Sequence, residues 1–489
     1  MTLTELLNGV TAIQVTGNIR DDKVTGIEYD SRKVNNDSVF AAIKGFNVDG
    51  HKFIPDALYS GAIAIILDNE GTTPNELYKH SGAAKILVND SRTALAEVSD
   101  YYFGHPSTKL NLIGITGTNG KTTISYFIKN ILETTGYKTG LLGTISNFIG
   151  DKKIVSKLTT PEANDLNEML LQMVNEGCEY AVMEVSSHSL TLKRVHSLYY
   201  SSAIFTNITA EHLDFHHDFE NYLNAKKILF DGLDVSAFVV YNSDDDNSKE
   251  VLNDCKAKRY SYGTLSGSDF LIKQIEYDLN GTSFIINYDA TDYRVTTSLV
   301  GEFNAYNATA AFAITKLYGV KEDQIIKGIK TTPQVPGRFE VISKGNKKVI
   351  IDYAHSADSL EKALKIVNNL NSDGAKIITV FGCGGNRDKL KRSQMGKIAS
   401  ELSDEVIITS DNPRDENPYK IIDDIRSGIV KKNYNVIENR AEAIKNAIHK
   451  SDNSSIILIA GKGHEDYQEI KGVRAHFSDR EVAENYLQS

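Results

Sequence analysis

The sequence predicts an α/β protein of three domains: a small N-terminal α/β domain, a central phosphate-loop (P-loop) domain with a mostly parallel sheet, and a C-terminal Rossmann-like domain. Three observations lead to this prediction. A chain of 489 residues is too long for one hydrophobic core. Strand and helix patterns alternate over most of its length. A glycine-rich phosphate loop follows one of the strands. We place the domains at residues 1–103, 104–335 and 336–489.

Composition narrows the function classes. The chain has 54 basic and 64 acidic residues, a net charge of −10, which argues against a general nucleic-acid or polyanion-binding role. Cys178, Cys255 and Cys383 are widely spaced and lack metal-ligand spacing, so we expect buried thiols in a reducing compartment. No stretch approaches the roughly 20 apolar residues of a membrane span, and the first residues do not read as a signal peptide. We therefore expect a cytoplasmic protein that is not attached to a membrane. We also expect a monomer.

The N-terminal domain is predicted from short strands and helices. Residues 39–43 and 62–67 read as strands, with a helix over 55–60 between them. Tyr29-Asp30-Ser31-Arg32 follows a strand and places a hydroxyl and a guanidinium in a loop. This pattern is typical of a binding loop, or equally of a capping aspartate beside a surface arginine. Residues 101–109, with a glycine and a proline, indicate the link into the next domain.

The central domain begins with a buried strand, Leu110 to Ile115, and the segment Gly114-Ile-Thr-Gly-Thr-Asn-Gly-Lys-Thr-Thr123. Glycines let backbone N–H groups close around phosphates, and the following helix adds partial positive charge at its N-terminus. The spacing is the short GxxGKT form, and the alternative is an ordinary glycine-rich turn. We predict triphosphate binding by Gly117, Thr118, Asn119, Gly120, Lys121, Thr122 and Thr123, with Lys121 on the terminal phosphates and the Thr122 hydroxyl on Mg²⁺.

Further strand ends of this domain carry polar groups. Glu184 ends the strand 180–185 and is a candidate magnesium ligand, or else a buried, paired structural carboxylate. The strand 203–207 leads into Glu211-His-Leu-Asp-Phe-His-His217, whose three histidines indicate a metal or phosphate site. On the helix 221–230, Lys226 and Lys227 point about 100° apart, so only one can face the site.

An antiparallel accessory sheet is predicted next, over residues 269–300, with a hairpin turn at Asn280-Gly281. Asn304 and Asn307 then begin an alanine-rich helix. Their amides could read an adenine edge or cap the helix, and the residues alone leave both interpretations open.

The C-terminal domain follows a break at Pro333 to Pro336 and again alternates strand and helix. Its glycine-rich segment 382–385 lacks the following glycine pattern and the ribose-binding acid of a dinucleotide site, so we reject NAD binding. Three successive strand ends carry Arg387, Arg414 and Glu465. They indicate a pocket for a polar small molecule, the alternative being surface charge.

Seven motifs occur in one order along the chain: Gly117-Thr-Asn-Gly-Lys-Thr-Thr, Glu184-Val-Ser-Ser-His, Thr206-Asn-Ile-Thr-Ala-Glu-His-Leu-Asp, Asn304 with Asn307, Pro336-Gly-Arg-Phe-Glu, Asp352-Tyr-Ala-His and Gly461-Lys-Gly-His-Glu-Asp-Tyr. In this respect the whole chain resembles the Mur ligase family. The resemblance implies ATP-driven amide formation in peptidoglycan precursor synthesis, hence in cell-wall growth and division. The D-glutamate carboxylate of UDP-N-acetylmuramoyl-L-alanyl-D-glutamate would become an acyl phosphate, from which an incoming amine displaces phosphate.

The resemblance also implies two magnesium ions. Thr122 and Glu184 would hold one ion, and Glu184, His212 and Lys226 the other. The family lysine at the position of Lys226 is carbamylated (N6-carboxylysine), which gives magnesium an anionic oxygen ligand. With Lys121, these residues would form the catalytic set.

Substrate positions follow from the same resemblance. Asn304 and Arg338 would flank ATP, and the UDP-muramoyl dipeptide would be bound by Ser31, Thr159, Thr160, Ser186 and Arg194. In the family, Asp-Asn-Pro-Arg marks enzymes that add meso-diaminopimelate, whose distal carboxylate pairs with the arginine. Here that implies a diaminopimelate pocket of Arg387, Asp411, Asn412, Pro413, Arg414, Gly461 and Glu465.

Three alternatives remain at this stage. The same ligase could use L-lysine. Folylpolyglutamate synthetases share the phosphate loop, but lack the N-terminal domain and the Asp-Asn-Pro-Arg segment. A nucleotide-dependent regulatory binding protein would tolerate loss of Arg414.

Overall fold

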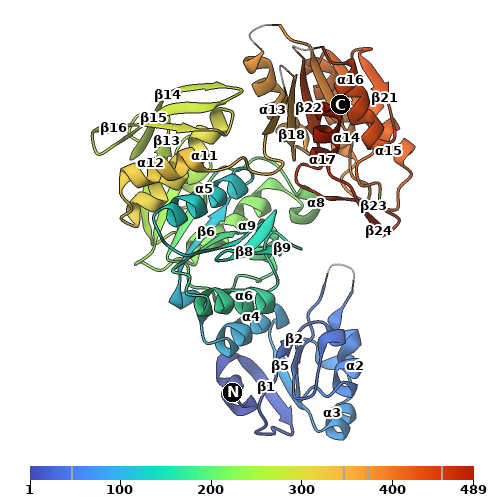
Figure 1. Cartoon of the computed structure of the whole chain (residues 1–489). Helices are drawn as coiled ribbons and strands as arrows, with labels where there is room; N and C mark the ends of the chain where they lie inside the picture. The colour runs from blue at the N-terminus through green and yellow to red at the C-terminus, as the bar shows by residue number, and fades with distance from the viewer. Residues whose placement is uncertain (46–47, 345–346, 372–373, 453–454, 489) are drawn as a thin grey trace. The chain divides into compact units, whose positions relative to one another are not determined.

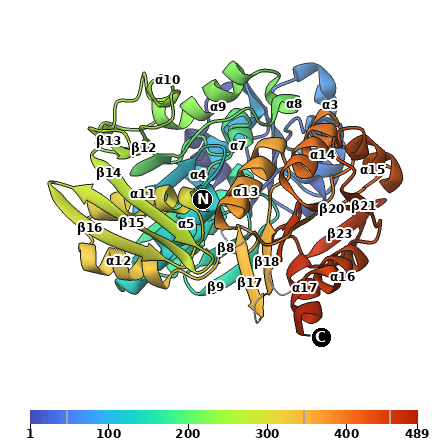
Figure 2. The ribbon, with the colours of Figure 1, turned by 90° about the horizontal axis from the view of Figure 1, so that it is seen from above.

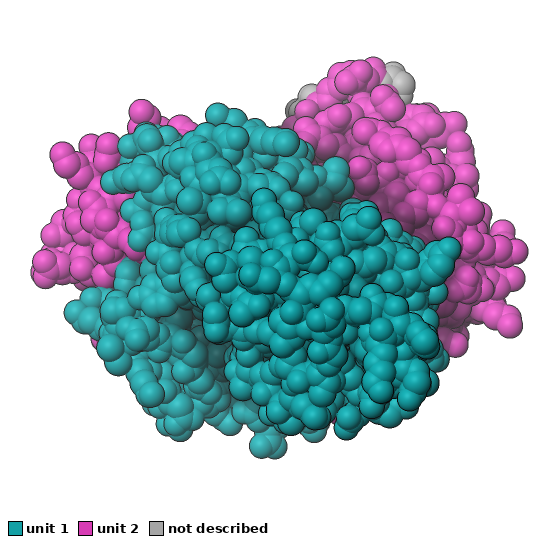
Figure 3. All heavy atoms as spheres, turned by 90° about the horizontal axis from the view of Figure 1, so that it is seen from below, with its two compact units in different colours: residues 1–209, 218–261 teal, residues 210–217, 262–489 magenta. Residues whose placement is uncertain are grey.

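The computed structural model describes residues 1–45, 48–344, 347–371, 374–452 and 455–488. The chain forms two compact units, which Figure 3 colours teal and magenta. The first comprises residues 1–209 and 218–261, and the second residues 210–217 and 262–489. Figure 1 labels the secondary-structure elements of both units.

The N-terminal part of the first unit is a five-stranded sheet in the order β1-β5-β4-β3-β2, parallel except for β1. Its helices bury leucine, valine and isoleucine side chains against the sheet, and Ala163 from the central part joins the same core. The elements are β1 (Ala12–Gly17), β2 (Ile27–Glu28), β3 (Val39–Ala41), β4 (Ala64–Leu67), β5 (Ala84–Val88), α1 (Leu3–Leu6), α2 (Ile54–Tyr59), α3 (Asn75–Ser81) and α4 (Ser91–Tyr102).

The central part of the first unit contains strands in the order β12-β11-β6-β10-β7-β8-β9. The five from β12 to β7 are parallel, and β8 and β9 continue as an antiparallel hairpin. The carboxyl ends of the parallel strands therefore meet at one edge of the sheet. The elements are β6 (Asn111–Thr116), β7 (Thr139–Leu142), β8 (Ser146–Ile149), β9 (Lys152–Val155), β10 (Tyr180–Glu184), β11 (Ser202–Phe205), β12 (Phe238–Asn242), α5 (Lys121–Thr134), α6 (Ala163–Asn175), α7 (Ser187–Thr191), α9 (Phe219–Asp231) and α10 (Ser248–Val251).

Helix α5 shows why the segment after the phosphate loop is helical. Ile124, Phe127, Ile128 and Ile131 recur at helical spacing, and all four are fully buried. Gly120 caps the helix with a φ of +94°, a conformation that a side chain would disfavour. The loop glycine thus sets where the helix begins.

The second unit starts with an antiparallel meander of β14 (Phe270–Asp278), β15 (Gly281–Tyr288) and β16 (Thr291–Thr297). The predicted accessory sheet and its turn at Asn280-Gly281 are confirmed. β13 (Lys258–Gly263) runs from the first unit into the second, and its last two residues pair in parallel with β14. The other elements before the C-terminal sheet are α8 (Leu213–His216), α11 (Glu302–Leu317) and α12 (Glu322–Thr331).

The C-terminal sheet has the order β17-β18-β22-β19-β20-β21 and is parallel except for β17. Ile350 packs with α13, α14 and α15 on one face, whereas its neighbours Val349 and Ile351 pack with α16 and α17 on the other. In Figure 2, α14 and α15 lie on one side of β20 and β21, and α16 and α17 on the other. The elements are β17 (Glu340–Lys344), β18 (Lys347–Asp352), β19 (Ile377–Phe381), β20 (Glu405–Ile408), β21 (Tyr434–Val436), β22 (Ile456–Ala460), β23 (Tyr467–Ile470), β24 (Val473–His476), α13 (Ala357–Leu370), α14 (Leu390–Leu402), α15 (Pro418–Arg426), α16 (Arg440–Lys450) and α17 (Asp479–Gln488).

The predicted fold class is confirmed: a small α/β domain, a mostly parallel phosphate-loop sheet and a Rossmann-like sheet follow one another. The boundaries at residues 103/104 and 335/336 stay predictions. The three cysteines are buried and unpaired, as expected, and burial raises the pKa of Cys383 to about 12. Within the described ranges, no helix is long and apolar enough to cross a membrane.

Candidate active site

The phosphate loop connects β6 to α5. Gly117 has a φ of +145°, and a Cβ there would lie 1.8 Å from the Thr206 hydroxyl oxygen, so only glycine fits. Lys121 Nζ donates hydrogen bonds to the carbonyl oxygens of Gly117 (2.8 Å) and Thr118 (2.9 Å). The lysine charge is therefore held directly over the loop, where phosphate oxygens could take over these bonds.

The segment after β11 holds this loop in shape. The Asn207 side chain accepts a bond from Asn119 N–H (3.0 Å) and donates one to the Asn119 carbonyl (3.2 Å). The Asn207 carbonyl accepts the Thr118 N–H at 2.7 Å. Asn207 thus braces the loop backbone from the neighbouring strand end.

Glu184 lies at the end of β10 and is almost fully buried. Its carboxylate accepts the hydroxyls of Thr122 and Thr144, each at 2.9 Å, and the Thr144 N–H, also at 2.9 Å. A buried carboxylate surrounded by hydroxyls is the kind of oxygen set that Mg²⁺ binds, so these residues fit the predicted ion.

Four residues predicted to bind the UDP sugar come together near Glu184. Thr159 shares a hydroxyl bond with Thr144 (3.1 Å), and Thr160 Oγ1 accepts the Ser186 N–H (3.1 Å). Arg194 donates to the Thr160 carbonyl at 3.2 Å. Ser31 belongs to the N-terminal domain, on the first turn of a 3₁₀ helix, where Asp30 is the cap and Arg32 is exposed.

Glu162 adds a charged partner to this group. Its carboxylate lies 2.8 Å from Arg194 Nε and 3.3 Å from Arg92 Nη1. Two guanidinium groups therefore share one carboxylate. Both can donate charge-assisted hydrogen bonds to an anionic substrate, which a chain with negative net charge must bind through local basic groups.

The two adjacent lysines of α9 lie in different surroundings. Lys226 is only 1% exposed, and its Nζ lies 4.4 Å from the centre of the Tyr222 ring. Lys227 instead pairs with Asp231 at 2.7 Å and with Asp254 at 2.5 Å on the outer side of the helix. Lys226 is thus the inward-facing member, and Tyr222 connects it to the phosphate loop through a hydroxyl contact with Thr118 (3.0 Å).

The histidine-rich segment 211–217 does not form the metal cluster that its spacing indicates. Across the described ranges, no three His, Cys, Asp or Glu side chains form a group that could hold a metal ion. His216 is buried, and His212 and His217, which have positive φ values, flank the short helix α8. Each predicted magnesium set contains a hydroxyl or a modified lysine and so does not require such a cluster.

Asn304 and Arg338, the two further residues predicted to bind ATP, lie in the second unit and contact different residues. Asn304 is buried, donates to the Val300 carbonyl (2.9 Å) and accepts from Asn307 (3.1 Å), so it does not cap α11. The Arg338 guanidinium lies 4.8 Å from the centre of the Tyr353 ring. Burial and the positive charge of Arg338 lower the pKa of the neighbouring His464 to about 3, so this ring is neutral near pH 7.

The residues predicted to bind diaminopimelate gather at the carboxyl edge of the C-terminal sheet. Asn412 donates to Glu465 at 2.7 Å, and Lys462 Nζ donates to the same Glu465 oxygen at 3.0 Å. A Cβ on Gly461 would lie 2.7 Å from Asp411 Oδ2, so these two residues are in close contact. Arg414 and the exposed Arg387 both lie beside Gly384, so the structure places these two arginine side chains next to the same glycine.

The hairpin β23–β24 supports this edge from outside. Gln468 donates to the Asp411 carbonyl (2.7 Å), and the Glu469 N–H donates to the Asn412 side chain (2.9 Å). The Arg414 N–H donates to the Glu469 carbonyl (3.1 Å) and its carbonyl accepts the Lys471 N–H (2.8 Å). Arg414 has a φ of +51°, and these main-chain bonds hold it in that conformation.

Sequence reasoning missed several of these residues. Thr144 follows β7 at the same sheet edge as the phosphate loop, a position that could have marked it. Lys462 carried no such signal, because nothing in Gly461-Lys-Gly463 indicates that the lysine is fully buried beside Glu465. Glu162 was missed because its partners come from distant parts of the sequence.

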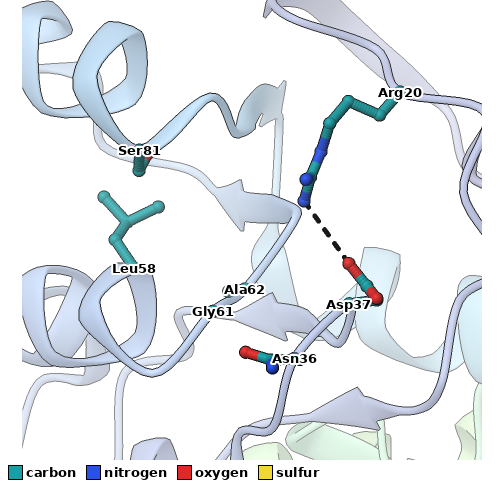
Figure 4. Close-up of a pocket in the computed structure, with 7 residues that line it drawn as sticks. All are labelled: Arg20, Asn36, Asp37, Leu58, Gly61, Ala62 and Ser81. Carbon is teal, nitrogen blue, oxygen red and sulfur yellow. Dashed lines mark hydrogen bonds and ion pairs between the residues drawn. The ribbon is translucent and has the colours of Figure 1, made fainter.

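A separate cavity of about 330 Å³ lies in the N-terminal domain. In Figure 4, Arg20 and Asp37 face each other across it, joined by a hydrogen bond of 3.4 Å. Its lining includes none of the predicted site residues, so it does not belong to the candidate active site.

Three family models match successive parts of the chain. Residues 23–103 match "Mur ligase family, catalytic domain", residues 115–315 match "Mur ligase middle domain", and residues 337–463 match "Mur ligase, glutamate ligase domain".

Full-length relatives agree with these matches. A Clostridium tetani protein named UDP-N-acetylmuramoyl-L-alanyl-D-glutamate–2,6-diaminopimelate ligase is 41% identical, over 100% of this chain and 99% of its own length. A Bacteroides fragilis protein of the same name is 42% identical, over 99% of this chain and 98% of its own. A solved structure of a ligase with this name is 30% identical and has a TM-score of 0.70. The match covers 100% of this chain and 99% of the chain in that structure.

Proposed function

This chain belongs to the Mur ligase family, and from that premise we infer that it is the ATP-dependent ligase that adds meso-diaminopimelate to UDP-N-acetylmuramoyl-L-alanyl-D-glutamate. The reaction forms an amide bond in peptidoglycan precursor synthesis and releases ADP and phosphate. Full-length identity of about 41% to relatives that carry this name supports it, together with the Asp411-Asn-Pro-Arg414 segment of this chain.

We propose that the amide forms in two steps. The D-glutamate carboxylate attacks the γ-phosphorus of ATP, and ADP leaves. The diaminopimelate amine then attacks the acyl carbon, loses a proton, and phosphate leaves. Lys121 would shift its hydrogen bonds from the carbonyl oxygens of Gly117 and Thr118 to the phosphoryl oxygens, and positioning with charge stabilisation would supply most of the acceleration.

We propose that the loop residues 117–123 bind the ATP phosphates, with Asn304 and Arg338 as further ATP ligands. Mg²⁺ would be held by Thr122 and Glu184, and a second ion by Glu184, His212 and carbamylated Lys226. When bound, these ions supply positive charge to the phosphoryl oxygens. The chain's own contribution is a buried carboxylate, kept in place by three hydrogen bonds from Thr122 and Thr144.

For the nucleotide sugar, we propose Thr159, Thr160, Ser186 and Arg194, with Ser31 from the N-terminal domain. The hydroxyl cluster and the arginines that share Glu162 support this assignment, because a diphosphate and peptide carboxylates need donors and positive charge. We further propose that the protein acts as a monomer in the cytoplasm.

The presence of Arg414 is the main support for meso-diaminopimelate, rather than L-lysine, as the added amino acid. A guanidinium pairs with the distal carboxylate of diaminopimelate but repels the terminal ammonium of L-lysine. Arg387, Asp411, Asn412, Pro413, Gly461 and Glu465 would complete this pocket.

One experiment tests the proposal. ADP release by the purified enzyme is measured with ATP, Mg²⁺, the UDP-muramoyl dipeptide and either meso-diaminopimelate or L-lysine. We expect release that needs both the dipeptide and diaminopimelate. Faster turnover of L-lysine would instead support the lysine-adding ligase, and release independent of both substrates would support a regulatory nucleotide-binding protein.

A further inference from the structure

The glycine-rich segment 382–386 is packed against the Asp411-Asn-Pro-Arg414 segment, backbone to backbone. Gly385 N–H donates to the Asn412 carbonyl (2.9 Å), and its own carbonyl accepts Arg414 Nη1 (2.8 Å). Asn386 N–H donates to a carboxylate oxygen of Glu416 (2.6 Å). The two segments therefore form one bonded layer that includes the Arg414 side chain.

This packing explains why residues 382–385 are rich in glycine although the segment is not a dinucleotide-binding motif. A Cβ on Gly385 would lie 1.9 Å from the Pro413 carbonyl oxygen, and one on Gly382 would lie 2.3 Å from the Thr409 carbonyl oxygen. A Cβ on Gly384 would lie 3.0 Å from Arg414 Nη1. The glycines allow the close approach that places a carbonyl group against the Arg414 guanidinium.

Arg392 on α14 contacts the glycine-rich segment and the residues that follow Arg414, and its side chain is fully buried. Its guanidinium donates to both carboxylate oxygens of Glu416, at 2.9 and 3.0 Å, and to the Gly384 carbonyl at 3.2 Å. A bidentate arginine–carboxylate pair fixes both partners in distance and in orientation. Arg392 thus ties the glycine-rich segment to the residues that follow Arg414.

Arg392 also has a second carboxylate partner. Its Nη1 donates a hydrogen bond to Asp424 at 2.9 Å. This bond joins α14 to α15 and does not involve the glycine-rich segment or the Asp411–Arg414 segment. The loop connection and the helix connection of Arg392 can therefore be removed separately.

We propose that Arg392 and Glu416 are positioning residues that hold the Arg414 guanidinium at the amino-acid pocket and thereby set the selection of a substrate with a second carboxylate. This inference rests on the proposed function. Glu416 stands two residues after Arg414 and bonds the residue after Gly385, so it restrains the guanidinium from both segments that support it. Neither Arg392 nor Glu416 needs to touch the substrate in this role.

The test compares Glu416→Gln with the matched control Asp424→Asn, which removes only the helix connection. Kinetics are measured for meso-diaminopimelate, L-lysine, ATP and the UDP-muramoyl dipeptide. We expect Glu416→Gln to raise the KM for diaminopimelate about 10-fold or more, because small displacements of a positioning group weaken its contacts steeply. The KM values for ATP and the dipeptide should stay unchanged, and Asp424→Asn should change the KM for diaminopimelate less than about 3-fold.

A double variant separates positioning from general destabilisation. If Glu416 acts through Arg414, then Glu416→Gln should add little to the KM effect of Arg414→Ala. Additive effects, or equal effects of Glu416→Gln and Asp424→Asn, would overturn the proposal. Should Glu416→Gln fail to fold, Glu416→Asp keeps the charge but shortens the side chain, and must still raise the KM for diaminopimelate selectively.

Measurements on the wild-type enzyme distinguish the proposed function from the positioning role of Glu416. If wild type does not use diaminopimelate, the proposed function itself fails. If wild type selects diaminopimelate and Glu416→Gln selects it equally well, only the positioning role is wrong.

Discussion

Replacing Arg414 with alanine should change which amino acid the enzyme accepts while leaving its chemistry intact. One of the five N–H donors of Arg414 is bonded to the Gly385 carbonyl at 2.8 Å, so a bidentate pair with a distal carboxylate can be made by others. Two charge-assisted bonds in a partly buried pocket are worth about 2–4 kcal/mol, which corresponds to a loss of about 30- to 900-fold in kcat/KM for meso-diaminopimelate. For L-lysine, kcat/KM should rise, because a like charge has been removed. The assay is ADP release at saturating ATP and UDP-muramoyl dipeptide.

The matched control is Arg426→Ala on α15, an exposed arginine of the same domain that pairs with Asp423. It should leave the ratio of the two kcat/KM values unchanged. The reasoning would be refuted if Arg414→Ala lowered turnover of both amino acids to the same extent, since the guanidinium would then not discriminate between them.

Three further outcomes are expected. Lys226→Ala should lower the rate of ADP release more than about 10-fold. Added short carboxylic acids should restore part of this activity, because their carboxylates can replace the carbamate oxygen ligand. Undiminished ADP release by the variant would contradict this expectation. Hydrogen bonds from Arg392 and from the Asn386 N–H lower the pKa of Glu416 from 4.5 to about 2, so the stability that this carboxylate contributes is present above pH 4.5 and is lost as the pH falls toward 2. Urea unfolding of wild type and Glu416→Gln should therefore converge on acidification, and a constant difference in the free energy of unfolding would count against the pair. The Arg440 guanidinium is 0% exposed and lies 2.7 Å from Asp479. Asp479→Asn would leave this buried charge beside a neutral partner, so the free energy of unfolding should fall by about 3–5 kcal/mol. A decrease below about 1 kcal/mol would contradict this expectation.

Much of the fold followed from local patterns. The buried strands and the helix after the phosphate loop could be predicted because apolar spacing alone determines them. The hairpins β8–β9 and β23–β24 were not predicted, although each contains a turn signal. Lys471 and Gly472 have φ values of +49° and +76°, which is the type I′ geometry of a two-residue hairpin turn. The strands beside these turns are only four residues long, so their alternation is weak.

The site was predictable where a motif carries its own chemistry and not where partners come from afar. Gly117 and Lys121 could be assigned because their spacing is that of a phosphate loop. The residue pattern alone left Lys226 and Lys227 equivalent; the family resemblance selected Lys226, and burial then distinguishes the two side chains. Arg392 gave no signal, because a basic residue on a helix is usually solvated, and its carboxylate partners lie 24 and 32 residues downstream.

The main-chain pairing of Arg414 with the β23–β24 hairpin has a consequence for how this ligase can diverge. Glu469 and Lys471 hold the backbone at this position whatever side chain it carries. A single codon change can therefore exchange the guanidinium without remodelling the loop. The φ of +51° limits which exchanges survive, since glycine, asparagine and aspartate adopt it readily and β-branched residues do not. Evolutionary drift in the chosen cell-wall building block would thus pass through a narrow set of replacements at one position.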